Sequence, residues 1–279
     1  MLTNTSEGWG GIFNISATAQ PVKNLNLMAA YTWTESKEVT GMPGNNAASA
    51  YQGIPTINGP HIPIAQRSQY VVPHRVIGSI GTKVFNWNAG NVGSSTHINL
   101  FYTGSSGFNY SYMYTNDLNG DGMGNDLMYI PANKGDIKFI SPADEDAFFK
   151  YMEEDKYLTK NKGKYAEAYA GRTPWVNNFD LKLTHEYYVG KSGGTKNTLQ
   201  FIADILNVGN LINNKWGVRQ TQYNTINQGR ILKVENITNN VPTYSFVKVK
   251  GEYPTTPYDY NYSIGETWRL QLGVRYIFN

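Results

Sequence analysis

The chain has 279 residues, of which 16% are charged and 14% aromatic; 24 basic and 21 acidic residues give a net charge of +3, and cysteine is absent. Scattered charges of both signs argue against a nucleic-acid partner, the lack of cysteine excludes disulfides and cysteine-based zinc sites, and no window approaches the roughly 18 consecutive apolar residues of a membrane helix. A membrane β-barrel is compatible with this composition, because its strands alternate apolar and polar residues.

Seven segments of the chain alternate apolar and polar residues with the period of two that a β-strand requires. In chain order they span 12–19, 25–34, 72–85, 96–104, 178–188, 197–206 and 268–278. In the last segment one face is shared by Trp268, Leu270, Leu272, Val274, Tyr276 and Phe278. About ten residues tilted at roughly 45° cross a bilayer once. The pattern therefore favours an all-β fold of antiparallel transmembrane strands.

The connections between these segments alternate between short and long. Turn-forming residues fill 21–24, 86–93 and 189–196, whereas the other connections are long and span 35–71, 105–174 and 207–265. Short periplasmic turns and long extracellular loops are typical of outer-membrane barrels, and this parity places Asn279 in the periplasm. A soluble sandwich has the same periodicity, so a soluble all-β binding or adhesion module stays open as the alternative.

Aromatic residues gather near the ends of the predicted strands, where they suit the interfacial girdles of a membrane barrel: Tyr31, Trp33, Phe85, Trp87, Tyr102, Tyr187, Tyr188, Trp268, Tyr276 and Phe278. High β propensity is the competing explanation for any one of them. The opposite faces carry charges of both signs, which would line the lumen of a wide barrel: Arg75, Lys83, Asp180, Lys182, Glu186, Asp204, Arg269 and Arg275.

Seven strands are too few for a complete membrane unit. Bacterial single-chain barrels have an even number of strands from eight upward, and an open sheet would leave unpaired backbone edges in lipid. The segment after Met1 lacks the positive and apolar regions of a secretory signal. We therefore expect residues 1–279 to be one part of a larger barrel, whose parent protein supplies the missing strands.

Several short motifs together resemble the C-terminal barrel portion of a TonB-dependent outer-membrane receptor of the Bacteroidetes-like branch. They are Val72-Pro73-His74-Arg75, Gly171-Arg172-Thr173-Pro174-Trp175 leading into Asn178–Leu183, Asp204-Ile205-Leu206-Asn207-Val208-Gly209-Asn210 and the final Arg275-Tyr276-Ile277-Phe278-Asn279. Ala30-Tyr31-Thr32-Trp33 also looks like the end of a receptor strand, so the resemblance runs over essentially the whole chain.

The resemblance implies a location in the cell outer membrane and a parent barrel of about 22 strands that imports a bulky nutrient with energy from TonB. It implies further partners: the membrane lipid, the rest of the barrel, an N-terminal plug and a TonB-contacting segment, neither of which can be placed in this sequence. The terminal aromatic Phe278 resembles the signal read by the barrel-assembly machinery, although Asn279 departs from the commonest ending. Ligand contacts are expected from the three long connections.

One loop has the oxygen spacing of a calcium site. Asp117, Asn119 and Asp121 alternate, Gly122 allows a tight turn, and Asp126 is the only late carboxylate because Met128 stands where an EF-hand has its bidentate glutamate. This spacing predicts a shortened calcium loop. The alternative is a turn rich in Asx and glycine on a surface loop.

Within 105–174, Ser141 and Pro142 predict the start of a short helix, with Phe148, Tyr151 and Met152 as an apolar stripe that packs against neighbouring loops. No catalytic constellation stands out. The four histidines, at 61, 74, 97 and 185, form no metal-binding pair, and no nucleophile or phosphate-loop motif is present. A carbohydrate-active enzyme would need a pair of carboxylates in a cleft, which the sequence does not indicate, so we expect no enzyme.

Overall fold

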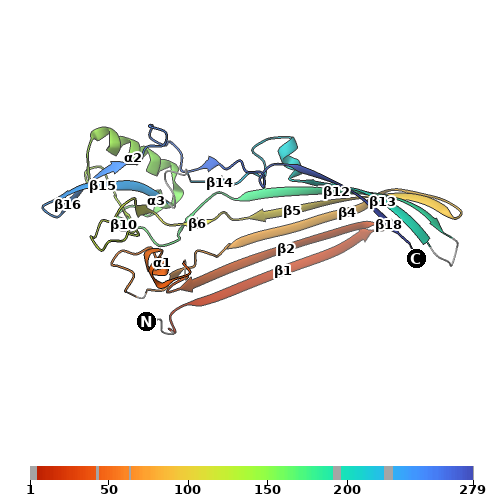
Figure 1. Ribbon diagram of the computed structural model, residues 1–279, viewed down its shortest axis with the longest axis horizontal. Helices are drawn as coiled ribbons and strands as arrows, with labels where there is room; N and C mark the ends of the chain where they lie inside the picture. Colours follow the sequence, from red (N-terminus) through yellow and green to blue (C-terminus); the bar gives the residue numbers. More distant parts are fainter. Residues whose placement is uncertain (1–4, 42–43, 63, 191–195, 223–228, 279) are drawn as a thin grey trace.

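The computed structural model describes residues 5–41, 44–62, 64–190, 196–222 and 229–278. Seven long strands form one antiparallel sheet (Figure 1) and confirm the seven predicted strands: β1 (Trp9–Val22), β2 (Leu25–Glu38), β4 (His74–Ala89), β5 (Val92–Ser105), β12 (Val176–Gly190), β13 (Lys196–Leu206) and β18 (Arg269–Ile277). Each strand pairs with the next of these in chain order, so that β1 and β18 lie at the two edges of the sheet.

Two of the three predicted short turns are visible, and both are shorter than the predicted 21–24 and 86–93 because the strands continue into these segments. Lys23 and Asn24 join β1 to β2, and Gly90 and Asn91 join β4 to β5. Asn24 and Gly90 have positive φ values of 68° and 59°, a conformation that asparagine and glycine tolerate best. The third predicted turn falls largely on 191–195, which lie outside the described residues.

The long connections are folded, not structureless. They hold the helices α1 (Ala47–Gln52), α2 (Pro142–Glu154), α3 (Lys156–Lys160) and η1 (Val208–Leu211), and short strand pairs. A small four-stranded sheet joins β7 (Met113–Tyr114), β15 (Arg230–Thr238), β16 (Val241–Phe246) and β9 (Lys138–Phe139). The two-residue strands β6 (Asn109–Tyr110) and β11 (Gly171–Arg172) pair, as do β8 (Tyr129–Ile130) with β10 (Lys164–Tyr165) and β14 (Gln220–Thr221) with β17 (Asp259–Tyr260).

Residues 106–173 and 229–258 form one body, which we call the loop cluster. It gathers at one end of the long strands (Figure 1) and contains the buried hydrophobic core of the chain. The largest fully buried side chains all belong to it, among them Tyr112, Tyr114, Phe148, Tyr151 and Met152. Sequence periodicity did not predict this core, because its parts come from two connections far apart in the chain and neither has a regular apolar repeat.

The predicted helix is confirmed as α2. Ser141 accepts a hydrogen bond from the Asp144 backbone N–H at 3.1 Å and Pro142 occupies the first turn, as helix N-termini favour. Its expected stripe is a packing face, since Phe148, Tyr151 and Met152 are fully buried. In the part of the chain that the structure describes, every helix is too short or too polar to cross a bilayer.

Candidate functional site

One face of the long sheet is apolar and open to its surroundings. A continuous row crosses all seven strands in register and consists of Ala19, Leu27, Ile80, Leu100, Leu181, Ile205 and Leu270. Exposure is high for side chains on this face, reaching 58% for Ile15, 50% for Ile80 and 74% for Leu272. No second layer covers this face in the described residues, so large apolar side chains stand where water or lipid would meet them.

Aromatic side chains border this apolar face at both ends. Near the loop cluster lie Trp9, Tyr31, Trp33, Tyr102, Trp175 and Trp268, and at the short turns lie Phe85, Trp87, Tyr187, Tyr276 and Phe278. We call these the loop-side belt and the turn-side belt, and the whole surface the belted face. Trp9 and Trp175 were not predicted as belt residues, whereas the other residues of the two belts were. The prediction for Tyr188 is wrong, because register puts it on the opposite face, where Lys196 lies over its ring at 4.0 Å.

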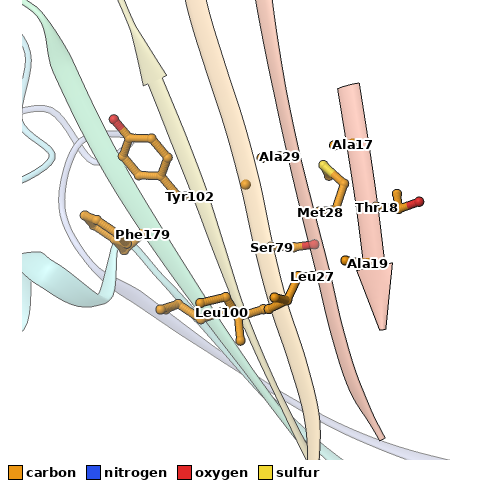
Figure 2. Close-up of a pocket in the computed structure, with 12 residues that line it drawn as sticks. Ala17, Thr18, Ala19, Leu27, Met28, Ala29, Ser79, Leu100, Tyr102 and Phe179 are labelled. Atoms are coloured by element: carbon orange, nitrogen blue, oxygen red, sulfur yellow. The ribbon is translucent and has the colours of Figure 1, made fainter. Parts of the chain in front are cut away.

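A shallow hollow of about 390 Å³ interrupts the belted face (Figure 2). Ala17, Ala19 and Ala29 are too short to fill it, and the rings of Tyr102 and Phe179, whose centroids are 5.0 Å apart, stand at its edge. The hollow follows from small residues placed beside aromatic ones on adjacent strands. Its lining is almost wholly apolar, so it offers no hydrogen bonds to orient a polar ligand.

The opposite face of the sheet is mostly polar and internally paired, although the exposed side chains of Ile12 and Phe101 also lie on it. Lys182 forms an ion pair with Asp204 at 3.2 Å, and Gln200 donates a hydrogen bond to Glu186 at 2.5 Å. Asp180 accepts the backbone N–H of Asn207 at 2.8 Å, which fixes the start of the connection after β13. Charges of both signs therefore share this face, as the sequence predicted, with several of them tied to cross-strand neighbours.

A buried tyrosine network holds the loop cluster together. The hydroxyl of Tyr112 donates to Asp155, Tyr110 and Tyr258 share a hydrogen bond of 2.8 Å, and Tyr258 donates to the backbone carbonyl of Arg172 at 2.9 Å. The other carboxylate oxygen of Asp155 accepts the backbone N–H groups of residues 157 and 158 at the start of α3. Burial raises the pKa of Tyr110 and Tyr112 well above the usual range, so both hydroxyls stay protonated. These hydrogen bonds therefore have a structural role and hold the parts of the loop cluster together.

The predicted calcium loop closes on itself. The two carboxylate oxygens of Asp117 accept the N–H groups of Gly120 and Gly122, both at 2.7 Å, and Asp121 accepts that of Met123 at 2.8 Å. Asp126 points back into the loop. It accepts the N–H of Leu118 at 2.7 Å and the side-chain amide of Asn119 at 2.8 Å.

Burial raises the pKa of Asp126, an effect that the bonds from Leu118 and Asn119 partly offset. Within the described stretches of the chain, no three His, Cys, Asp or Glu side chains are grouped so as to hold a metal ion. The geometry of Asp117, Asn119, Asp121 and Asp126 is thus that of an Asx/glycine turn, and calcium binding stays a prediction.

Comparisons with known proteins identify no relative. No protein-family model matches the chain, and neither a curated protein nor a solved structure matches it.

Proposed function

We propose that this chain is the C-terminal part of a membrane β-barrel in the cell outer membrane, from a parent receptor that resembles the TonB-dependent family and imports a bulky nutrient. The observation that carries the proposal is the belted face, with an apolar band between two rows of aromatic side chains. In this proposal the band contacts lipid hydrocarbon, and tryptophan and tyrosine lie at the two membrane interfaces, where their amphipathic rings are favoured.

The height of the belted face supports this proposal. His74 lies opposite Trp33 of the loop-side belt and is eleven positions before Phe85 of the turn-side belt on the same strand. A bulge between Lys83 and Phe85 takes up one of these positions, which leaves a length of about 33 Å at roughly 3.3 Å per residue. Strands in outer-membrane barrels tilt by about 40°, which reduces this length to about 25 Å along the membrane normal, the height of the apolar band of such barrels.

A soluble sandwich fits these features less well. Two packed sheets bury their facing apolar side chains in a shared core about 10 Å thick. Here Leu272 and Val274 are 74% and 68% exposed, and the buried core lies in the loop cluster. Burying an apolar side chain stabilises a protein in water by about 1.5–3 kcal/mol, so a soluble protein that left a whole sheet face uncovered would forgo much of its driving force.

The sheet edges determine the partners in this proposal. In lipid, the free backbone groups of β1 and β18 need hydrogen-bonding partners, and the remaining strands of the parent barrel would supply them. The plug and the TonB-contacting region would lie in that remainder. The barrel-assembly machinery would recognise the final strand with Phe278, and the loop cluster would lie outside the cell, where it is placed to contact the nutrient.

Cell fractionation tests the proposal. The chain and the longer polypeptide that we propose around it are each expressed in a Gram-negative host, and their electrophoretic mobility is compared with and without boiling. We expect the longer product to enter the outer membrane and to shift on heating, as closed barrels resist detergent while folded. A soluble, monomeric and cooperatively unfolding 279-residue product would favour the sandwich module and contradict the proposal.

A further inference from the structure

A half-enclosed pocket of about 330 Å³ lies between the first long connection and the loop cluster. Its apolar wall comes from Ile54, Ile57, Ile62 and Ile64 of the first long connection, while Leu127 and Ala166 belong to the loop cluster. Polar and apolar groups both line the pocket, and Lys37, Gln66 and Arg67 are among the polar residues. The pocket is therefore amphipathic, unlike the hollow on the belted face.

Two basic residues from paired strands line this pocket. Lys37 of β2 lies directly opposite Arg67 of β3 (Gln66–Arg67) in an antiparallel pair, which places both side chains on one face of the ribbon. Like charges directly opposite each other destabilise a strand pair. Among the residues that the structure describes, neither side chain takes part in an ion pair, although Glu167 lines the same pocket and Glu38 is the next residue along β2.

One nitrogen of the Arg67 guanidinium also lacks a partner. Its Nε is shielded from solvent and has no hydrogen-bond acceptor among the described residues, and the Oε1 of Glu38 is likewise shielded and without a donor. A shielded donor without a partner destabilises the fold, and more strongly when it is charged. The charge of Arg67 also affects Arg172 of β11. Burial, and after it the charge of Arg67, lowers the pKa of the Arg172 guanidinium. The pocket thus has two basic residues that form no ion pair among the described residues, one acidic residue, Glu167, and an apolar wall.

We propose that this pocket binds a small amphipathic anion, whose carboxylate or phosphate lies between Lys37 and Arg67 and whose apolar body lies against Ile54, Ile57 and Ile62. An oxyanion separates the two cations and gives Arg67 Nε its missing acceptor in a charge-assisted hydrogen bond. A soluble organic acid and an anionic lipid both supply this chemistry. The inference concerns a pocket in the connections and does not depend on the membrane proposal.

Calorimetric titration of the full chain in a non-ionic detergent tests the inference. The probes are phenyl phosphate and 3-phenylpropionate, and the neutral control is 3-phenylpropanamide, which keeps the apolar body and lacks the charge. We expect both anions to bind and the amide not to bind. Arg67→Gln should weaken binding by roughly tenfold to hundredfold, as expected for one charge-assisted bond, and Lys37→Gln with Arg67→Gln should abolish it.

Matched substitutions keep the test sharp. Lys150→Gln with Lys160→Gln removes two exposed charges from the loop cluster and should leave the dissociation constants unchanged. Arg67→Lys, which keeps the charge and loses the planar fork, should retain part of the affinity. Should Arg67→Gln not fold, as judged by circular dichroism, competition on the unaltered chain replaces it, and inorganic phosphate should displace phenyl phosphate.

Nanodiscs of phosphatidylcholine with or without phosphatidylglycerol distinguish the source of the anion. If the anionic lipid occupies the pocket, phosphatidylglycerol should raise the apparent dissociation constant of phenyl phosphate for the unaltered chain; an unchanged constant assigns the pocket to a soluble acid. Equal binding of anions and amide, or full binding by the Lys37→Gln, Arg67→Gln double variant, would overturn the proposal. Membrane insertion is measured separately, so the two proposals can fail independently.

Discussion

Replacing Leu272 by arginine puts a charge at the centre of the belted face. Leu272 lies four residues from Trp268 and four from Tyr276, which places it about 13 Å along the strand from each belt at roughly 3.3 Å per residue. If this face contacts lipid, Leu272→Arg should cost about 2–4 kcal/mol, the usual value for arginine at the midplane of a barrel's lipid face. If the face contacts water, a side chain already 74% exposed should tolerate the change within about 0.5 kcal/mol.

Two control variants isolate the effect of depth and of face. Gln271→Arg places the same charge on the polar face, beside Asp204 on the neighbouring strand, and should be close to neutral. Tyr276→Arg lies in the turn-side belt and should cost about 0–1 kcal/mol, because the penalty falls toward the interface. The assay is urea unfolding of the longer polypeptide that we propose around the chain, refolded into phospholipid vesicles, because seven strands alone do not close a barrel. Equal midpoints for Leu272→Arg and Gln271→Arg would refute the reasoning.

The remaining predictions concern the loop cluster. Asp155→Ala removes the buried acceptor of Tyr112 and of the α3 N-terminus. It should lower the free energy of unfolding by about 3 kcal/mol, measured in melts followed by near-ultraviolet circular dichroism. The control Glu154→Ala changes an exposed residue and should lower it little. Gly229 has a φ of +75° and an added Cβ would lie 2.3 Å from the Ser111 carbonyl oxygen, so Gly229→Ala should cost roughly 2 kcal/mol or more; Gly135→Ala, with positive φ and open space around it, should cost about 1 kcal/mol. Burial raises the pKa of Tyr258 to about 12 from 10.0, so the folded state holds this proton longer than the unfolded chain. Stability should be constant below pH 10 and fall between pH 10 and 12, with Tyr258 contributing roughly 1.4 kcal/mol per pH unit. Tyr110 and Tyr112, whose pKa values are also raised, should make the fall steeper. Stability that holds to pH 12 would contradict the buried network. Calcium binding by Asp117, Asn119, Asp121 and Asp126 predicts a rise in melting temperature in millimolar Ca²⁺ that Asp121→Asn removes, and an unchanged transition would leave the loop a self-closed turn.

The long strands were predictable because their signal is local. Alternation of apolar and polar residues is read within ten residues, so segments such as 178–188 and 268–278 could be placed without any partner. Helix α2 was predictable for the same reason, because Ser141 and Pro142 are residues typical of a helix N-terminus. The face of a residue at a strand end is less secure. Tyr188 was assigned by its nearness to Tyr187, whereas the register puts these neighbours on opposite faces.

The loop cluster and the anion pocket depend on contacts between distant residues. Tyr114 stacks on Tyr244 at 5.3 Å although 130 positions separate them, and no local repeat encodes that pairing. Lys37 and Arg67 are joined only by the return of the chain after α1. Trp9 could have been found from the sequence, because it extends the period of two from Phe13 toward the N-terminus.

The most direct test of the belted face is its contact with lipid. The chain has no cysteine, so a single cysteine at each of positions 270–274 carries one environment-sensitive fluorophore. The substitutions are made in the longer polypeptide that we propose around the chain, with any cysteine outside residues 1–279 replaced. Quenching by lipids with a nitroxide in the acyl chain is then measured in vesicles. We predict strong quenching for Leu270→Cys, Leu272→Cys and Val274→Cys, and weak quenching for Gln271→Cys and Gly273→Cys. Quenching that does not alternate, or that comes only from a water-soluble quencher, would contradict the account.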